Sequence, residues 1–283
     1  MRNVKISVLS GKGGTGKTTV AVNLAKVIDN SLYADCDVEE PNGYLFLIPD
    51  ITKEIPVKIK IPEIDYSKCT LCGDCVKACR FGALAHIGKR ILVFDHLCHS
   101  CGACFEMCPH NAIIEKDKII GGIRIGKSGS VDFIEGKLNI GEAIGVPILK
   151  EIKKIINSYN DKIVVVDSSP GTSCSVINSI DNSDMCILVT EPTPYGFHDL
   201  KLAVELVRSM NLPMAVVINK SGDEDEIIEK YCKEQDIDVL MKIPFKKEIA
   251  KAYSKGKLLV DFDKEIKDKF KQLSGQVMEL IKR

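Results

Sequence analysis

The sequence predicts an α/β fold in which a mostly parallel sheet is covered by helices on both faces and is interrupted by a small α+β unit. Apolar runs typical of strands alternate with amphipathic segments typical of helices, which is the pattern of a parallel sheet. The clearest run, 162–167 (KIVVVD), is apolar at successive positions, as in strands buried on both faces. A different composition appears at 69–108, which holds eight of the twelve cysteines. One domain is therefore interrupted by a shorter one.

The first part of the sheet is predicted from the segments before the cysteines. An apolar strand over 4–9 stops at a glycine-rich loop, and a helix over 17–28 follows. A second strand over 32–36 ends in an acidic turn. The stretch 53–64 (KEIPVKIKIPEI) alternates and contains prolines, which indicates an edge strand or a linker.

The rest of the sheet is predicted from the segments after the cysteines. Glycines first separate short strand-like pieces, and a helix over 147–159 then precedes the strand at 162–167. Three further strands with their helices are predicted at 185–190 with 199–210, at 214–219 with 224–235, and at 239–243 with 246–255 and 263–282. We assign residues 1–60 and 119–283 to the α/β domain and residues 61–118 to the insert.

Composition and charge exclude several classes of function. Lys+Arg and Asp+Glu both number 39, so the zero net charge predicts no specific nucleic-acid partner. The N-terminus lacks the long apolar region of a signal peptide. The sequence contains no run of about eighteen apolar residues, which is the length that a membrane span needs. We therefore expect a cytoplasmic protein, in which regular CxxC spacing indicates metal ligation rather than disulfides.

A phosphate-binding loop is predicted at residues 11–18, which read GKGGTGKT and satisfy G-x-x-x-x-G-K-[ST] between a strand and a helix. Glycines let backbone N–H groups turn inward around phosphate oxygens, and the helix dipole points at the same anion. Lys17 would reach the β- and γ-phosphates, and the hydroxyl of Thr18 would bind Mg²⁺. A glycine-rich turn with incidental lysines is the alternative, which the agreement of motif and context disfavours.

Lys12 is a second lysine in this loop, and it makes the loop resemble the deviant Walker A ATPases, the superfamily of MinD, ParA, Mrp and the nitrogenase iron protein. The resemblance implies a P-loop fold of the SIMIBI type and an ATP-dependent nucleotide-sandwich homodimer. Within it, Lys12 would stabilise charge on the partner's phosphates, as an arginine finger does. The alternative is a solvated loop lysine.

Other segments resemble the same superfamily in the same order. The resemblance implies that Asp37 positions the attacking water, that Asp35 supports the Mg²⁺ shell, and that Asp167 holds magnesium through water as in Walker B. It also implies that Asn219 contacts the purine base and that Pro244 belongs to the segment covering it. The catalytic residues would be Lys12, Lys17 and Asp37. The nucleotide-binding residues would be Gly11, Lys12, Gly13, Gly14, Thr15, Gly16, Lys17, Thr18, Thr19, Asn219 and Pro244.

The cysteine-rich segment contains two runs of the form C-x₂-C-x₂-C-x₃-C, at 69–79 and 98–108. They resemble the runs of bacterial ferredoxins, which bind two [4Fe–4S] clusters, the fourth cysteine of each run ligating the other cluster. The resemblance implies two ligand sets. The first set is Cys69, Cys72, Cys75 and Cys108, and the second is Cys98, Cys101, Cys104 and Cys79.

Alternatives to two such clusters are Cys₄ zinc sites and a degraded or three-iron cluster. The repeated spacing of both runs favours the [4Fe–4S] interpretation. Arg80 stands where ferredoxins usually have proline, a change that would alter the potential without removing a ligand.

The remaining cysteines and the histidines are expected to play no part in the clusters. Cys174 follows Walker B and is interpreted as an ordinary small residue, Cys36 and Cys186 as core residues, and Cys232 has no evident role. The five histidines are His86, His96, His99, His110 and His198. Most of them are interpreted as surface residues, the alternative being hydrogen bonds to cluster sulfurs.

Two functions follow from these predictions. The first is a Mg²⁺-dependent ATPase that couples ATP binding and hydrolysis to iron–sulfur redox chemistry or metallocluster assembly, with a redox or cluster-assembly protein as partner. Because the insert begins soon after Asp37, in the presumed switch I, the junction is the candidate coupling device. The second is a MinD/ParA-like positioning switch in which the clusters form an interaction surface. The amphipathic tail, 263–282, favours core packing over membrane docking.

Overall fold

The computed structural model describes residues 2–282 and contains one large sheet. Its strands are β1 (Val4–Leu9), β2 (Ser31–Cys36), β3 (Asp50–Ile64), β6 (Ile113–Ser128), β7 (Val131–Leu138), β8 (Ile163–Ser168), β9 (Met185–Thr190), β10 (Met214–Ser221) and β11 (Val239–Pro244). Their order is β11-β10-β9-β1-β8-β2-β7-β6-β3. Neighbours from β11 to β7 are parallel, whereas β6 and β3 extend the sheet antiparallel beyond β7.

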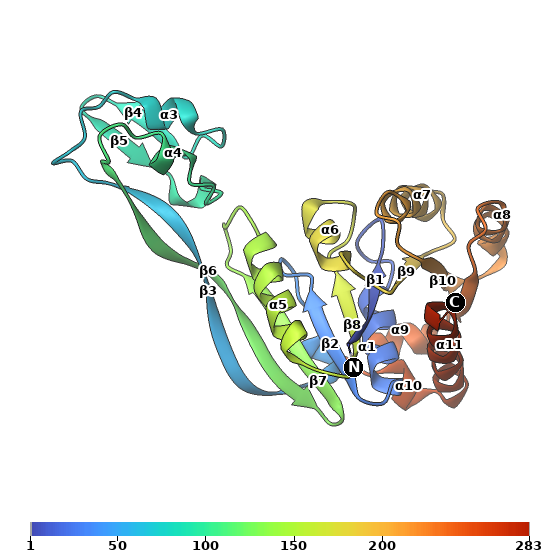
Figure 1. The fold of residues 1–283 in the computed structure, drawn as a ribbon. Coiled ribbons are helices and arrows are strands. Elements are labelled where there is room, and N and C mark those ends of the chain that lie inside the picture. Colours follow the sequence, from blue (N-terminus) through green and yellow to red (C-terminus); the bar gives the residue numbers. More distant parts are fainter. Residues whose placement is uncertain (1, 283) are drawn as a thin grey trace.

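Helices cover both faces of the parallel part (Figure 1). One face carries α1 (Lys17–Val27), α2 (Tyr44–Leu47), α9 (Lys247–Tyr253), α10 (Leu259–Phe262) and α11 (Lys264–Lys282). The other carries α5 (Val146–Ser158), α6 (Cys174–Ile180), α7 (Pro194–Ser209) and, after the short η2 (Asp223–Asp225), α8 (Glu226–Glu234). Every residue of β2 and of β9 is buried, as expected for strands enclosed on two sides. The predicted α/β fold is confirmed.

A long ribbon leaves the sheet at its antiparallel edge. β3 and β6 pair from Asp50 opposite Lys127 to Ile64 opposite Ile113 and carry the segment 65–112 at their far end (Figure 1). That segment contains α3 (Asp74–Ala78), β4 (Leu84–Ile87), β5 (Arg90–Val93), η1 (Asp95–Leu97) and α4 (Ala103–Glu106). We call it the cysteine module. The domain limits predicted at 60/61 and 118/119 lie within the ribbon.

The structure corrects two predicted elements. The short strand-like pieces predicted after the cysteines are the long strands β6 and β7. The helix predicted to begin at Asp199 begins at Pro194, because proline suits the first helical turn and the Thr193 hydroxyl accepts the Gly196 N–H at 3.0 Å. The stretch 53–64 is confirmed as an edge strand.

The C-terminal helix α11 packs as predicted. Its apolar face is buried in the core that α1 also contributes to, through Ile266, Phe270, Leu273 and Val277. Among residues 2–282, no helix has both the length and the apolar character that crossing a membrane requires.

Candidate functional site

The loop between β1 and α1 has the backbone shape that its glycines predict. Gly14 and Gly16 adopt φ of 80° and 93°, a region that favours glycine. A Cβ on Gly11 would lie 2.2 Å from the backbone oxygen of Asp199, so this position also requires glycine. The loop ends at the N-terminus of α1, where unpaired backbone N–H groups attract anions.

A cavity of about 430 Å³ opens over this loop, within the usual size range of ligand pockets. Eight of the predicted nucleotide-binding residues line it: Gly13, Gly14, Gly16, Lys17, Thr18, Thr19, Asn219 and Pro244. Gly11, Lys12 and Thr15 do not. Phe245 and Tyr253 also line the cavity, and Phe245 is 73% exposed, which leaves it available to a flat aromatic ligand.

The side chain of Asn219, which lines this cavity, also lies against the loop. Its side-chain nitrogen donates to the backbone oxygen of Thr15 at 2.7 Å, and a Cβ on Gly16 would lie 2.1 Å from the same nitrogen. The buried Thr15 hydroxyl has no hydrogen-bond partner among the described residues. The loop is therefore held by β10 on one side, and one of its polar groups is left for a ligand or water.

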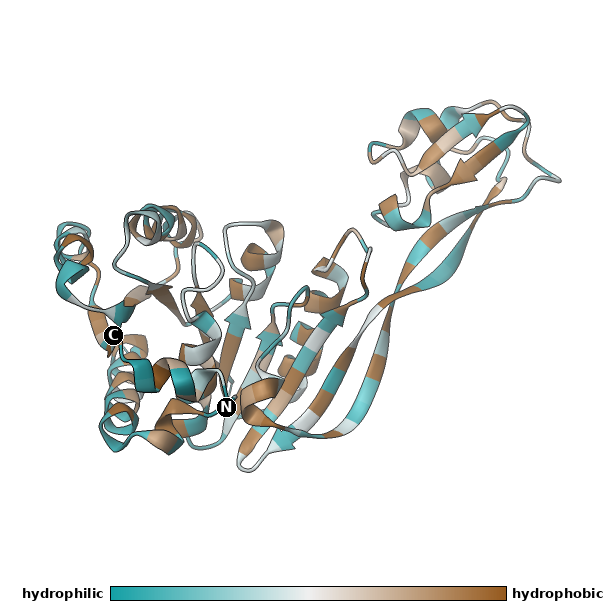
Figure 2. Cartoon of the chain, turned by 180° about the vertical axis from the view of Figure 1, so that it is seen from behind, coloured by the Kyte–Doolittle hydropathy of each residue, from teal (hydrophilic) through white to brown (hydrophobic). Residues whose placement is uncertain are grey.

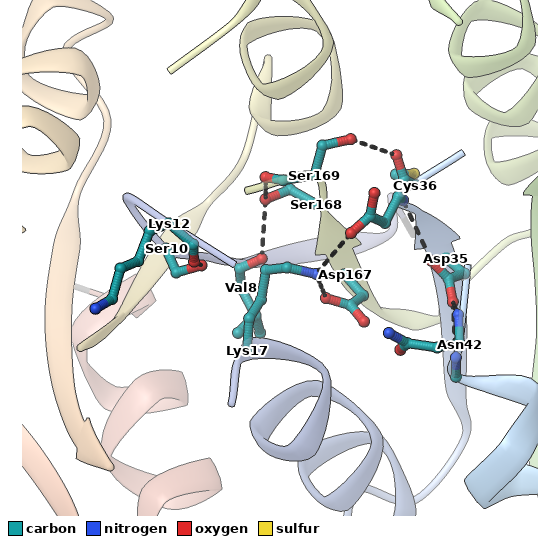
Figure 3. A network of polar contacts seen from close by, with 12 residues as sticks. Val8, Ser10, Lys12, Lys17, Asp35, Cys36, Asn42, Asp167, Ser168 and Ser169 are labelled. Atoms are coloured by element: carbon teal, nitrogen blue, oxygen red, sulfur yellow. Dashed lines mark hydrogen bonds and ion pairs between the residues drawn. The ribbon is translucent and has the colours of Figure 1, made fainter. Parts of the chain in front are cut away.

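Lys17 lies at the centre of a buried charge cluster (Figure 3). Its Nζ is 2.5 Å from Oδ1 of Asp167 and 3.6 Å from Oδ2 of Asp37. Burial lowers the pKa of Lys17, but Asp167, Asp37 and Asp35 outweigh it and hold that pKa above its ordinary value. Burial raises the pKa of Asp37 to about 6, against the lowering effect of Lys17. Of the three aspartates, only Asp37 lines the cavity.

Asp35 is fully buried beside Asp167 and is held by the backbone of the next turn. Its carboxylate accepts N–H groups from Gly43 at 3.0 Å and from Asn42 and Asp37 at 3.2 Å. Burial and the charge of Asp167 raise the pKa of Asp35 well above its usual range. This turn also explains Gly43, where a Cβ would lie 2.1 Å from the Tyr33 hydroxyl.

Lys12 does not join this cluster, and Figure 3 shows its side chain directed away from Lys17. Its Nζ lies 2.7 Å from Oε1 of Glu191, whose Oε2 is 2.7 Å from Nζ of Lys220. Burial raises the pKa of Glu191, but the two lysines outweigh it and lower that pKa. Glu191 is not among the residues predicted from the sequence, although an acid directly after β9 on the loop side of a parallel sheet could have suggested a role.

The eight predicted cluster cysteines lie around two cavities in the cysteine module. One is lined by Cys69, Cys72, Cys75 and Cys108, and the other by Cys79, Cys98, Cys101 and Cys104. The structure thus brings together the same two sets that the ferredoxin resemblance implies. Within residues 2–282, no three His, Cys, Asp or Glu side chains converge on a position suited to a single metal ion.

Backbone hydrogen bonds to sulfur repeat in the two halves of the module. Ala83 N–H donates to Sγ of Cys79 at 3.3 Å, and Ala112 N–H donates to Sγ of Cys108 at 3.2 Å. A third such bond, from Ser100 to Cys98, measures 3.4 Å. Bonds of this kind stabilise thiolate charge and tune the potential of iron–sulfur clusters.

The other cysteines and histidines are placed as follows. Cys36, Cys186 and Cys232 are buried, which confirms core positions for the first two, and Cys174 is exposed. His99 and His110 line the two cysteine cavities, and His99 stacks on Phe81 with ring centroids 3.8 Å apart.

The α/β fold and the glycine loop with its lysine and aspartates define a nucleotide-binding protein of the P-loop class. Comparison with known families makes this more specific: the family model described as the CobQ/CobB/MinD/ParA nucleotide binding domain matches residues 6–260. The chain belongs to that family. Its ATP-binding domain is of the MinD/ParA type.

Two curated relatives cover almost the whole chain. An uncharacterized protein of Methanocaldococcus jannaschii is 35% identical over 262 residues, covering 91% of this chain and 92% of the relative. An iron-sulfur cluster carrier protein of the same organism is 24% identical over 297 residues, covering 98% of this chain and 84% of the relative.

Solved structures share the fold at lower identity. The septum site-determining protein MinD of Pyrococcus horikoshii, complexed with Mg-ADP, has a TM-score of 0.60 and 20% identity over 97% of this chain and 96% of its own. The cell division ATPase MinD of Pyrococcus furiosus has a TM-score of 0.59 and 18% identity over 98% of this chain and 99% of its own.

Proposed function

We propose that this chain is a Mg²⁺-dependent ATPase that acts as an ATP-dependent homodimer and couples its nucleotide cycle to two [4Fe–4S] clusters. The observation that carries the proposal is the joint presence of a nucleotide cavity and two four-cysteine cavities on one continuous sheet. Relatives named iron-sulfur cluster carrier proteins, in M. jannaschii and in Pyrococcus abyssi at 26% identity over 85% of this chain, agree with it. The partner would be a redox or cluster-assembly protein.

In the nucleotide site, each residue has a role that its position supports. Lys17 leaves its carboxylate partners to bind the β- and γ-phosphates, which exchanges one charge-assisted contact for another. Thr18 would bind Mg²⁺, with Asp167 holding it through water and Asp35 supporting its shell, and the bound ion would supply neutralisation of phosphate charge. Asp37 orients the attacking water from the cavity wall, and Phe245 and Pro244 cover the base.

To contact phosphates bound to the partner subunit, Lys12 would have to leave Glu191. The Lys12 side chain is 31% accessible and that of Glu191 10%, and Lys220 stays paired with Glu191 when Lys12 leaves, so breaking the pair costs about 1 kcal/mol. A lysine side chain held this weakly can leave Glu191 and contact the phosphates bound to a second subunit when ATP is present. The role of Lys12 in trans is therefore compatible with its position in one subunit.

In the cysteine module, the eight thiolates would hold the clusters, which would supply one-electron chemistry or be the cargo that is handed on. The donor set suits them, because four cysteines surround each cavity and three of the sulfurs accept backbone N–H groups.

The test is the rate of ATP hydrolysis by anaerobically reconstituted protein with its clusters oxidised, reduced or removed. We expect the rate to differ between these states. The same rate in all three would overturn the coupling. A Lys17→Ala sample measured in parallel gives the background rate of contaminating ATPases.

A further inference from the structure

A row of charged side chains crosses the sheet from the nucleotide site to the ribbon. Asp35 on β2 is in register with Asp167 on β8 and with Glu135 on β7. Glu135 is in register with Arg124 on β6, and Arg124 with Glu54 on β3. Residues paired across neighbouring strands project from the same face, about 5 Å apart. The row therefore runs without interruption from the predicted magnesium aspartates to the strands that carry the cysteine module.

The contacts within the row are direct on the ribbon side. Arg124 donates to Oε1 of Glu135 through Nε at 3.0 Å and through Nη2 at 2.5 Å. Its guanidinium also lies over the ring of Tyr44, 5.0 Å from the centroid. Tyr44 directly follows Gly43, which donates to Asp35. One short turn thus contacts both Asp35 and Arg124.

Glu135 is the least expected member of the row. It is fully buried, and its Oε2 has no hydrogen-bond partner among the described residues. On the same face of β7, Val131 and Phe133 are buried apolar residues of the core. An apolar side chain would meet the needs of packing at 135, whereas a buried carboxylate with one free oxygen is costly. The charge therefore points to a role other than packing.

The position of Glu135 makes it sensitive to the nucleotide. It lies beside Asp35, whose surroundings change in charge when Mg²⁺ and phosphates bind, and interactions between charges are strong in a buried environment. Arg124 is the cation paired with Glu135, and 33% of its side chain remains exposed, so it can move while the sheet stays intact.

We propose that Glu135 and Arg124 are positioning residues of the nucleotide site, and that through them magnesium–nucleotide binding changes the conformation of the β3–β6 ribbon. The proposal rests on the proposed function in one respect, the role of Asp35 at magnesium. It adds the residues through which the site and the ribbon influence each other, and linkage requires that influence to be mutual.

The test is hydrogen exchange of the ribbon peptides in the full, cluster-loaded chain, with and without a non-hydrolysable ATP analogue and Mg²⁺. We expect the nucleotide to change exchange in 50–64 and 113–128 of the wild type. Glu135→Gln keeps the size and a hydrogen bond to Arg124 but removes the charge, so it should abolish this response and weaken nucleotide binding about five- to tenfold. Arg124→Gln should act in the same way, and Arg124→Lys should restore part of the response.

Lys118→Gln is the matched control, since Lys118 is also on β6 and pairs with Glu142 at 2.8 Å but lies outside the row. It should retain the wild-type response. The absence of a response in the wild type, or an unchanged one in both Glu135→Gln and Arg124→Gln, would overturn the proposal. Hydrogen exchange does not depend on turnover, so the two proposals can fail separately. If Glu135→Gln loses the exchange response while the hydrolysis rate is the same in every cluster state, the role of Glu135 and Arg124 is supported and only the redox coupling is overturned.

Discussion

The α/β core and the cysteine module are stabilised in different ways. In the core, strands such as β2 and β9 are buried at every position, and three apolar clusters fill the space between sheet and helices. In the module and at the adjoining end of β6, the cluster of buried residues consists of Cys75, Leu84, Ile91 and Ile113. Figure 2 shows polar and apolar residues alternating along the ribbon that carries the module.

We expect the module, and not the core, to need a bound cofactor in order to fold. Burial of apolar area contributes about 25 cal/mol per Å², and we expect so short a segment as 65–112 to bury too little to offset its chain entropy. The core needs no such help. We expect loss of iron to affect the cysteine module, and substitutions in the nucleotide site to affect the α/β core.

Removal of iron should have the largest effect. In small metal-folded domains the metal contributes on the order of 10 kcal/mol, so the module should lose its structure in the iron-free protein while the core still binds nucleotide. Hydrogen exchange of 65–112, with nucleotide affinity measured on the same sample, checks this. Cys174→Ser is the control, because Cys174 is exposed and outside the module, and it should retain iron. Equal protection of the module with and without iron would contradict the comparison.

Lys17→Ala should abolish nucleotide binding and leave the module unchanged. The substitution removes the buried cation between Asp167 and Asp37, which would then repel phosphate, and losing one partner of a buried pair typically costs about 3–5 kcal/mol of stability. Calorimetric titration with Mg–ATP measures the binding, and iron content and visible absorbance report on the module. Binding at wild-type affinity would show that the cavity does not use Lys17.

The local elements were predictable where a single segment carries the signal. The phosphate loop, the strand at 163–168 and the burial of α11 all follow from contiguous patterns. The ribbon strand β6 did not follow from its sequence, because its glycines were interpreted as breaks between short strands. A Cβ on Gly121 would lie 2.2 Å from the backbone oxygen of Lys137, and one on Gly126 would lie 2.2 Å from that of Asp50. These glycines allow neighbouring strands to approach, and only the pairing reveals it.

The residues of the site also divide into those that the sequence predicts and those that it does not. Asp35, Asp37 and Asp167 end strands whose carboxyl ends meet at one edge, and their proximity follows from a parallel sheet. Glu135 lies within a strand, and nothing near it in the sequence distinguishes it from a surface acid. Its place beside Asp35 depends on register across β2 and β7, which the local sequence does not encode.

Lys12→Ala should separate binding from turnover in the core. Lys12 does not line the nucleotide cavity, so affinity should change only a few-fold, while turnover should fall by about 10³-fold if the lysine acts on the partner's phosphates as an arginine finger does. Sedimentation with ATP would measure the accompanying loss of dimer. Lys220→Ala is the matched control, since it removes the other lysine of Glu191. Unchanged turnover in Lys12→Ala would show that Lys12 is a surface lysine without a catalytic role.

Asp37→Ala should lower turnover by about 10²-fold and trap an ATP-bound dimer. Because the pKa of Asp37 is raised to about 6, its carboxylate is present above that pH and is protonated below it. Wild-type hydrolysis should therefore decline as pH falls through about 6, and the residual rate of Asp37→Asn should lack this decline. Glu40→Ala, at another acid that lines the cavity, is the control. Rapid turnover in Asp37→Ala would remove Asp37 from the catalytic role.

Glu191→Gln should have the smallest effect, and in the opposite direction. Glu191 holds Lys12 and Lys220 in one subunit, so neutralising it releases Lys12 for a second subunit. Since partly exposed ion pairs contribute about 0.2–1 kcal/mol, ATP-dependent dimerisation should strengthen by a factor of about 1.4 to 5. The gain should vanish when Glu191→Gln is combined with Lys12→Ala, because the released lysine is then absent. Weaker dimerisation in the single variant would mean that Glu191 itself contacts the second subunit, so that the ion pair belongs to the dimer rather than opposing it.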